Sequence, residues 1–442
     1  MSREGSLEAP TRHPLDWENP QFHDRAQLDE ELERVFDICH GCRRCVSLCN
    51  SFPTLFDLVD ESPTMEVDGV AKADYAKVVE QCYLCDLCFM TKCPYVPPHE
   101  WAIDFPHLML RAKATAFQEQ GTSLRNRVLA STDQVGALAS LPLVAEVVNA
   151  VNRSDLGRKA LAATLGVHPQ ARVPEYHSSK GRNRLDRLDG PDQPPQPAGN
   201  SSGKVALFVT CYGNYNAPQL VEDLARVLIH NGITVTRVRQ ERCCGMPKLE
   251  LGDLQSVAQA KEQNIPQLLE LVEDGWDLIA PVPSCVLMFK QELPLMFPHD
   301  AAVARVKAAF FDPFEYLLER HRYGLLRLDF KQSLGRVLYH AACHQRVQNI
   351  GPKTRDLLQL IPGTEVQSIE RCSGHDGTYG VKAEYFEFSK KICRPIVREL
   401  DERAPDHYGS DCPMAGAHIE NFSEGDKATE HPLSLLRLAY GI

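Results

Sequence analysis

The chain has 442 residues, enough for about three domains, and a hydrophobic content of 43% that is ordinary for a soluble globular protein. Its net charge of -11 argues against a general nucleic-acid binder, because neutralising phosphates requires clustered Lys and Arg. The polar N-terminus shows no signal peptide, and no apolar run reaches the ~18 residues of a spanning helix. We therefore expect a cytoplasmic protein, in which the 16 cysteines serve metal or redox chemistry rather than disulfides.

Residues 1–110 hold eight of the cysteines in two tight motifs, CHGCRRCVSLC from residue 39 and CYLCDLCFMTKCP from residue 82. Two residues between successive cysteines let a loop offer three thiolates to one iron–sulfur cube, whereas the trailing cysteine ligates the other cube. The spacing predicts two 4Fe–4S clusters. The ligands of one are Cys39, Cys42, Cys45 and Cys93, and those of the other are Cys82, Cys85, Cys88 and Cys49. Zinc is the alternative, but its four-cysteine sites use paired CxxC knuckles, which these triplets match badly.

Residues 111–203 contain no cysteine and read as a connector. The helix-like sequence TSLRNRVLASTDQVGALASLPLVAEVVNAVN is followed by SSKGRNRLDRLDGPDQPPQPAGNSSG, whose Pro, Gly, Ser and charged residues predict a flexible, exposed linker. The apolar run from residue 135 is broken by Pro142 and Glu146 and is too short to span a membrane. It either lies along a surface or packs in the core, and packing is favoured.

Residues 204–442 read as two copies of one α/β unit, covering 204–330 and 331–442. The runs that we interpret as strands are KVALFVTC, ITVTRVRQERCCG and WDLIAPVPSC, and then GRVLYHAACH, TEVQSIERCSG and HYGSDC. Each run ends at a cysteine, and corresponding cysteines are separated by a nearly constant offset of about 130 residues. Strands alternating with helices predict parallel sheets, with each cysteine beyond the carboxyl end of a strand.

The two units differ in their candidate ligands. The first supplies four thiolates, enough for a cubane, from Cys211, Cys243, Cys244 and Cys285. The second supplies only Cys343, Cys372 and Cys412, because Ser373 takes the position of Cys244. It would hold a cluster with an open or non-cysteine fourth site, or none. The local candidates for that site are His340, His344 and His375, although a hydrogen-bonded loop histidine is favoured for each one. Cys393 is expected to be a buried structural thiol.

The layout resembles the family of the iron–sulfur C subunit of anaerobic glycerol-3-phosphate dehydrogenase. More broadly, it is similar to heterodisulfide-reductase-related proteins with paired cysteine-rich CCG domains. Besides the two N-terminal motifs, the matching pieces are SLRNRVLASTDQVG, CYGNYNAPQL, ERCCGMP, YHAACHQ, CSGHDGTYGVK, SDC and EHPLSLL. The departures are CSG in place of a second CCG, and Ala415 where the family often has another cysteine.

The resemblance implies a helical, ferredoxin-like domain with two 4Fe–4S clusters, a tandem pair of α/β CCG domains and one further iron–sulfur cluster. It implies an electron-transfer subunit that relays electrons between a flavoprotein or other redox partner and a quinone or other acceptor. A peripheral contact with the cytoplasmic face of the inner membrane is also implied. The alternative is a catalytic subunit that reduces a disulfide or thiol at a CCG iron–sulfur site, which an open iron would favour.

Two cofactor-binding motifs are missing from the chain. No GxGxxG motif follows a predicted strand, and no phosphate-binding GxxxxGK motif occurs. We therefore expect no flavin or nicotinamide site, and hydride transfer requires such a cofactor.

Overall fold

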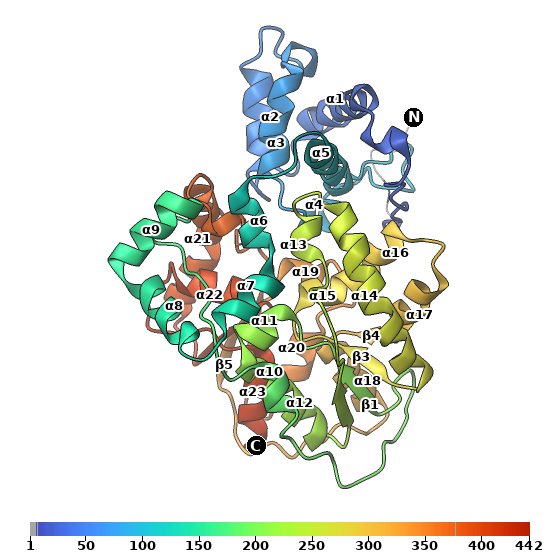
Figure 1. Ribbon diagram of the computed structural model, residues 1–442, viewed down its shortest axis with the longest axis vertical. Helices are drawn as coiled ribbons and strands as arrows, with labels where there is room; N and C mark the ends of the chain where they lie inside the picture. Colours follow the sequence, from blue (N-terminus) through green and yellow to red (C-terminus); the bar gives the residue numbers. More distant parts are fainter. Residues whose placement is uncertain (1–5, 7, 376) are drawn as a thin grey trace.

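The computed structural model describes residue 6 and residues 8–375 and 377–442. In Figure 1 the helical N-terminal part stands at the top, above a body that contains two α/β units. The connector helices flank the body at the left, and the C-terminus lies at the bottom.

The N-terminal part is helical, as expected. Its helices are η1 (Pro20–His23), α1 (Arg25–Cys42), α2 (Ser51–Asp60), η2 (Val67–Gly69), η3 (Lys72–Asp74), α3 (Tyr75–Gln81), α4 (Leu87–Thr91) and α5 (Phe105–Gln120). The Asp24 side chain accepts a hydrogen bond from the backbone of Gln27 and so caps α1, which ends where Arg43 adopts a φ of 52°. Helix α5 runs through residue 110, so the boundary placed there by the sequence lies inside a helix.

The connector forms five helices and packs against the second α/β unit. They are α6 (Leu124–Ala130), α7 (Thr132–Ala139), α8 (Val144–Arg153), α9 (Asp155–Leu165) and α10 (Gly181–Leu185). Arg125 forms an ion pair with Glu384 at 2.6 Å, and the His168 ring stacks on Phe386 with 3.7 Å between centroids. These contacts hold the connector against a segment far along the chain.

The first unit is built on a parallel sheet with the order β2-β1-β3-β4. Its strands are β1 (Lys204–Leu207), β2 (Thr234–Arg237), β3 (Asp277–Ile279) and β4 (Phe310–Phe311). Its helices are α11 (Cys211–Tyr215), α12 (Pro218–His230), α13 (Met246–Leu249), α14 (Leu254–Glu273), α15 (Pro283–Leu287), η4 (Met288–Glu292), α16 (Leu293–Met296), α17 (Ala301–Ala309) and α18 (Pro313–Arg322). The three predicted strands are confirmed, and the two-residue β4 is additional.

The second unit repeats this arrangement with the order β6-β5-β7, again all parallel. Its strands are β5 (Arg336–His340), β6 (Glu365–Ile369) and β7 (His407–Ser410). Its helices are α19 (Cys343–Arg346), α20 (Lys353–Leu358), η5 (Tyr379–Val381), α21 (Phe386–Arg403), α22 (Pro413–Glu420) and α23 (Pro432–Tyr440). In both units the first strand is central and lies between the second and the third, which confirms the predicted repeat.

The hydrophobic cores join the parts of the chain. One core runs from the N-terminal helices into the first unit and includes Phe36, Met109 and Phe208. A second core is shared by the two units and includes Leu207 and Tyr339. Because both units contribute to one core, their relative position is fixed by packing rather than by the loop between them.

A buried ion-pair network ties the N-terminal segment to the first unit. Arg12 lies 2.5 Å from Asp86 and 2.8 Å from Asp104, and 3.7 Å from Glu292 at the end of η4. The side chains of Arg12, Asp86 and Glu292 are each at most 7% exposed. A buried carboxylate that loses its cation is costly, so this arginine holds three carboxylates in place.

We expect Arg12→Ala to lower the free energy of unfolding by about 3–5 kcal/mol, because it leaves buried carboxylates unpaired. The control is Arg25→Ala, which removes an exposed pair with Glu119 and should cost less than about 1 kcal/mol. Denaturant unfolding measures both, and equal losses would contradict the proposed role of Arg12.

The network also predicts a pH dependence. Although burial opposes the shift, His107 and Arg12 lower the pKa of Asp104 to about 2, from 3.8. A depressed carboxyl pKa stabilises the fold above its unfolded value, and this stability is lost as the pH falls from about 4 to about 2. The difference between the chain and its Arg12→Ala variant should therefore shrink over that interval.

Candidate functional site

The first N-terminal group (Cys39, Cys42, Cys45 and Cys93) surrounds a single cavity. Cys39 and Cys42 lie on the last turn of α1, Cys45 on the loop that the left-handed Arg43 redirects, and Cys93 just beyond α4. Aromatic and apolar side chains of Phe52, Tyr95 and Ile103 complete the wall.

The thiols of this group lie close enough to affect one another. Burial, followed by the proximity of Cys93, Cys45 and Cys42, raises the pKa of Cys39. Burial, followed by Cys93 and Cys42, raises the pKa of Cys45 to about 12, and burial foremost raises that of Cys93 to about 11. Gathered thiolates need positive charge between them, which the irons of a cluster would provide.

The second N-terminal group (Cys49, Cys82, Cys85 and Cys88) also converges. Burial, with Cys82 and Cys85 next in effect, raises the pKa of Cys49. Burial also raises the pKa of Cys88, and Cys45, Cys85, Cys82 and Cys49 all contribute. Cys49 thus joins three cysteines more than thirty positions away in sequence, as the cross-ligating spacing predicts.

In the first unit four thiols form a connected chain. Cys211 begins α11, Cys243 and Cys244 follow β2, and Cys285 lies in α15. Hydrogen bonds from Cys211 and then from Cys244 lower the pKa of Cys243, and Cys244 also contacts Cys285. The beginning of α7 closes this group, because Thr132 Oγ1 donates to Cys243 Sγ at 3.5 Å.

In the second unit Cys343 and Cys372 form a pair. Hydrogen bonding from Cys343, and then from the Tyr83 hydroxyl although burial opposes it, lowers the pKa of Cys372 to about 7. Tyr83 Oη and Cys372 Sγ are 3.1 Å apart, and the backbone N–H of Gly374 donates to the same sulfur at 3.3 Å. The sulfur of Cys372 is thus contacted by Cys343, by the Tyr83 hydroxyl and by the Gly374 N–H, which donates to it.

The other candidate ligands of the second unit are Cys412 and Ser373. Cys412 is the N-cap residue of α22, and its charge acts on Tyr212 and Tyr408. Ser373 is buried, and its hydroxyl accepts a hydrogen bond from the backbone of His375 at 3.4 Å. Thus the Ser373 hydroxyl takes part in a local hydrogen bond at the position where the first unit has the thiol of Cys244.

The two units treat the equivalent cysteine in the same way. The pKa of Cys243 is lowered by Cys211, which begins the helix after the first strand, and that of Cys372 is lowered by the corresponding Cys343. Each of the two sulfurs also contacts a hydroxyl group from outside its own unit. That hydroxyl belongs to Thr132 of the connector in one case and to Tyr83 of the N-terminal part in the other. Sequence reasoning did not single out either residue, since neither is a ligand type for soft metals.

The second N-terminal group and the second unit meet directly. The proximity of Cys372 and then of Cys85 raises the pKa of Cys343, and Cys372 acts on Cys49 electrostatically. The Tyr379 hydroxyl adds a 2.6 Å hydrogen bond to Gln81 just before Cys82. Thiols from three sequence-distant segments therefore form one contiguous sulfur-lined region.

The three histidines named from the sequence have different environments. Both ring nitrogens of His340 are engaged, with Ser410 Oγ and Arg371 O each at 2.9 Å. His344 bonds Ser284 of the first unit at 2.7 Å. His375 is buried, and within the described residues neither of its ring nitrogens has a hydrogen-bond partner. Hydrogen bonding therefore engages His340 and His344 as expected, although His340 ends strand β5 and His344 lies on α19 rather than in a loop. The expectation fails for His375, whose ring nitrogens have no hydrogen-bond partner among the described residues. Cys393 is fully buried among apolar side chains, as expected.

A groove of about 580 Å³ opens where the second N-terminal group meets the second unit. Cys49 and Cys372 both line it. Its basic lining residues are Lys92, Arg346, Arg371 and Lys391. The one acidic lining residue, Glu370, lies 3.6 Å from Arg346. The groove is therefore positively charged and suits a negatively charged ligand.

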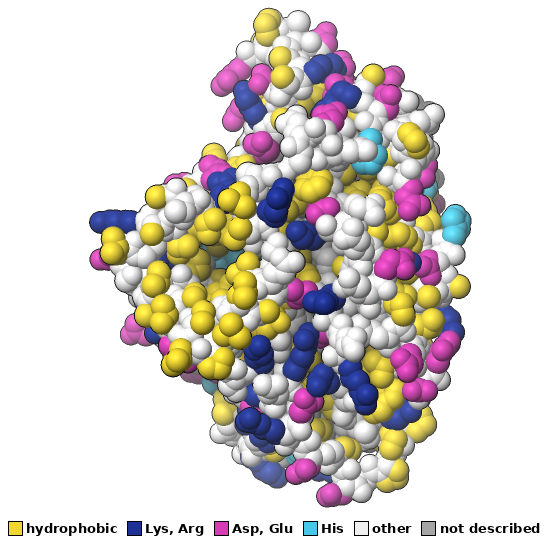
Figure 2. Space-filling model, viewed as in Figure 1, with side chains coloured by type: hydrophobic (Ala, Val, Ile, Leu, Met, Phe, Trp, Pro, Cys, Tyr) yellow, Lys and Arg dark blue, Asp and Glu magenta, His cyan; other side chains and the backbone are white. Residues whose placement is uncertain are grey.

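The connector presents an exposed apolar surface, although we expected its apolar run to pack in the core. The exposed large apolar residues of α6 to α9 and their turns, called here the connector surface, are Leu124, Leu138, Leu141, Leu143, Val144, Val147, Val151 and Leu156. Leu143 and Leu156 are each 80% exposed, and Figure 2 shows hydrophobic side chains gathered over this lobe at the left. The expectation of packing is therefore wrong for this face. No single helix among the described residues is long and apolar enough to span a membrane, and α7 with α8 qualifies only as a pair bent by 106°.

The donor sets suit clusters better than single ions. Among the described residues, no three His, Cys, Asp or Glu side chains are grouped as the ligands of one metal ion would be. The thiolates of a cubane bind different irons and stand at separate corners, so they need to surround a cavity rather than a point. The cavity lined by all four cysteines of the first N-terminal group has that form.

Cross-ligation predicts how losses of iron combine. After anaerobic reconstitution of the full chain, Cys39→Ala and Cys93→Ala should each lose about four irons, and the double variant should lose no more, because both residues serve one cluster. Cys39→Ala combined with Cys88→Ala should lose about eight. Cys393→Ala is the control and should keep its iron. Additive losses for Cys39 and Cys93 would refute the shared site, and zinc in place of iron would refute both.

The sequence was compared with known proteins. The profile of the cysteine-rich domain CCG matches residues 205–290 and 337–420, one match in each unit. The chain is 29% identical over 340 residues to the C subunit of anaerobic glycerol-3-phosphate dehydrogenase of Escherichia coli, covering 75% of this chain and 81% of that protein. It is 28% identical over 250 residues to the B subunit of fumarate reductase (CoM/CoB) of Methanothermobacter marburgensis, covering 54% of this chain and 47% of the relative. It is 26% identical over 227 residues to an uncharacterized iron–sulfur protein of Methanocaldococcus jannaschii, covering 51% and 42%. Two of these relatives are subunits of a dehydrogenase and of a reductase, and the third is an iron–sulfur protein.

Proposed function

We propose that this chain, which carries two CCG cysteine-rich domains, is the iron–sulfur electron-transfer subunit of an oxidoreductase complex. It would relay electrons between a flavoprotein or other redox partner and a quinone or other acceptor. The observation that carries the proposal is the contact of Cys85 with Cys343, which joins the N-terminal cysteines to the second unit without an intervening layer. The relationship to subunits of dehydrogenase and reductase complexes supports it.

The N-terminal groups would each hold a 4Fe–4S cluster, and the first unit would hold a further one. Such clusters, when bound, supply one-electron carriers whose potentials depend on burial and on hydrogen bonds to sulfur. The chain supplies both, since Cys82 and Cys88 are buried and hydroxyl groups reach Cys243 and Cys372. Tyr83 would hold a proton at its oxygen and donate it in a hydrogen bond to the Cys372 sulfur.

A second function is favoured by one observation, the basic groove beside Cys49 and Cys372. Its charge suits an anionic disulfide, which two electrons and two protons would reduce to two thiols at the second unit. If the chain is such a reductase, Arg371→Ala and Lys391→Ala should raise KM for an anionic disulfide more than kcat falls, in an assay driven by a reduced viologen dye. If the chain reduces no disulfide under these conditions but still passes electrons to a quinone, the reductase function is excluded and only the electron-transfer function remains.

The two units should differ in iron content. Cys243→Ala should remove about four irons, because it deletes a thiolate from a complete set of four. Ser373→Ala should leave the iron nearly unchanged, because clusters select soft thiolates over a hydroxyl oxygen. Iron and sulfide analysis of the anaerobically reconstituted chain measures both. Equal losses from the two variants would make Ser373 a true ligand and the two units equivalent.

We further propose that the connector surface is a peripheral membrane contact. An apolar surface of this kind marks an interaction site. The same helices expose Lys159, Arg153 in a pair with Glu175, and the acidic Glu146 and Asp155. An exposed apolar face on such short helices suits shallow insertion among lipid headgroups.

Replacing Leu143 and Val147 by Glu should abolish flotation with vesicles that contain anionic lipid, because two charges would enter the apolar contact. Leu438→Glu, at an exposed leucine on α23, is the matched control and should float as the unaltered chain does. Carbonate should release the unaltered chain from the vesicles. Flotation that survives the double substitution, or binding that resists carbonate, would contradict a peripheral contact through this surface.

A further inference from the structure

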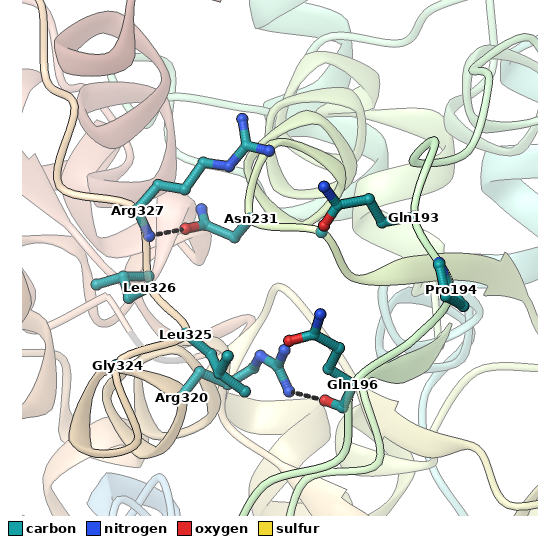
Figure 3. Close-up of a pocket in the computed structure, with 10 residues that line it drawn as sticks. Gln193, Pro194, Gln196, Asn231, Arg320, Gly324, Leu325, Leu326 and Arg327 are labelled. Atoms are coloured by element: carbon teal, nitrogen blue, oxygen red, sulfur yellow. Dashed lines mark hydrogen bonds between the residues drawn. The ribbon is translucent and has the colours of Figure 1, made fainter.

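A second cavity lies far from the cysteines, on the amino-terminal side of the first sheet. It has a volume of about 190 Å³ and is formed by three segments. They are the linker before β1 (Gln193, Pro194 and Gln196), the turn between α12 and β2 (Asn231 and Gly232), and the end of α18 with the chain that leaves it (Arg320 and 324–327). In Figure 3 Gln193 lies across an open space from Gln196 and the Arg320 side chain, whereas the Asn231 amide is turned to the backbone of Arg327.

Arg320 is buried without a matching anion. Only 2% of the residue is exposed, and in the described part of the chain it forms no ion pair within 4.0 Å. Its Nη1 donates to Gln196 O at 2.7 Å and to Ser201 Oγ at 3.3 Å. Its Nε is buried without any partner among the described residues. A buried guanidinium with an unused donor is costly unless a negative charge is brought to it.

The nearest carboxylate does not fill this role. Asp277 acts on Arg320 electrostatically, yet its Oδ2 already accepts from the backbone and hydroxyl of Ser202 at 2.6 and 2.8 Å and from Tyr316 Oη at 2.9 Å. The lining contains no Asp or Glu, and Arg327 adds a second cation whose backbone is held by Asn231 Oδ1 at 2.8 Å. The cavity therefore offers the Arg320 guanidinium and the amides of Gln193 and Gln196, with the exposed Arg327 at its rim, and its lining holds no carboxylate.

We propose that this cavity binds a small tetrahedral oxyanion, either inorganic phosphate or the phosphate group of a small metabolite. A planar guanidinium presents N–H donors that match phosphate oxygens, and the amides of Gln193 and Gln196 can donate to those that remain, whereas the Asn231 amide already donates to Val227 O. The volume fits an anion of this size, since one water occupies about 30 Å³ in the liquid. The bound anion connects the linker, the first unit and the chain that leads into the second unit, so it holds these segments together.

The full chain is titrated with inorganic phosphate by calorimetry, and its melting temperature is followed with phosphate, with a small phosphomonoester, and with chloride at matched ionic strength. Mass action predicts a rise of a few degrees with phosphate in about hundredfold excess over its dissociation constant. A rise with phosphate alone identifies the free ion, and a larger rise with the phosphomonoester identifies a metabolite. Equal melting in phosphate, phosphomonoester and chloride overturns the site.

Two variants locate the effect. Arg327→Gln should weaken phosphate binding about tenfold by removing one charged donor, and Arg320→Met should abolish the binding. Arg322→Gln is the matched control, because Arg322 lies on the same helix but is exposed and pairs with Glu319 at 3.2 Å. If Arg320→Met fails to fold, Arg327→Gln still decides. Phosphate binding unchanged in Arg327→Gln would place the anion elsewhere.

Binding should also slow proteolysis of the linker. Residues 186–203 form loops and turns, and Gln196 O already accepts from Arg320, so the anion would fix the linker from the cavity side. Phosphate should lengthen the half-life of the intact chain under limited proteolysis in the unaltered protein and in Arg322→Gln, but not in Arg327→Gln. Protection that is equal in all three overturns the assignment. None of these measurements depends on iron, so the anion site and the electron-transfer proposal fail separately.

Discussion

The close approach of the Cys85 and Cys343 side chains is the contact on which the arrangement of the candidate centres depends. It brings a loop of the N-terminal part onto the carboxyl edge of the second sheet. Tyr83 reaches past it to Cys372, and Tyr379 bonds back to Gln81, so the junction is held from both sides. The ion-pair network of Arg12 fixes the same N-terminal part against the first unit. A relay needs its centres at constant separation, and these two attachments provide it.

A common rule governs both units. The sulfur of the first cysteine after the second strand accepts hydrogen bonds from the cysteine that begins the helix after the first strand and from a hydroxyl in another part of the chain. Such bonds favour the thiolate, which is the form that binds iron. The units then diverge, since Cys244 and Cys285 extend the set in one, whereas Ser373 is tied to the backbone of His375 in the other. This divergence is the physical basis for expecting one complete cluster site and one incomplete site.

Much of the fold could be predicted from the sequence because β1, β3 and β5 are largely buried and apolar, and because all six predicted strands lead to cysteines. All six of those strands are present, whereas β4 pairs only two residues and leaves no periodic pattern. The convergence of Cys49 and Cys93 on cysteines of the other motif follows the spacing. Other features depend on tertiary contacts. The contacts of Tyr83 and Thr132 bridge 289 and 111 positions, which a local pattern does not report. The connector surface was misplaced because periodicity shows that a helix has an apolar face but not what covers it.

In the proposed arrangement, two iron–sulfur clusters lie close together in the N-terminal part, beside the second unit. Electron paramagnetic resonance of the dithionite-reduced full chain tests it most directly. Two neighbouring paramagnetic clusters should give a spectrum broadened by their magnetic interaction and integrating to about two spins from the N-terminal part, with the Cys243→Ala variant used to remove the contribution of the first unit. A single sharp signal of about one spin in that variant, or no signal from protein that contains zinc, would contradict the account.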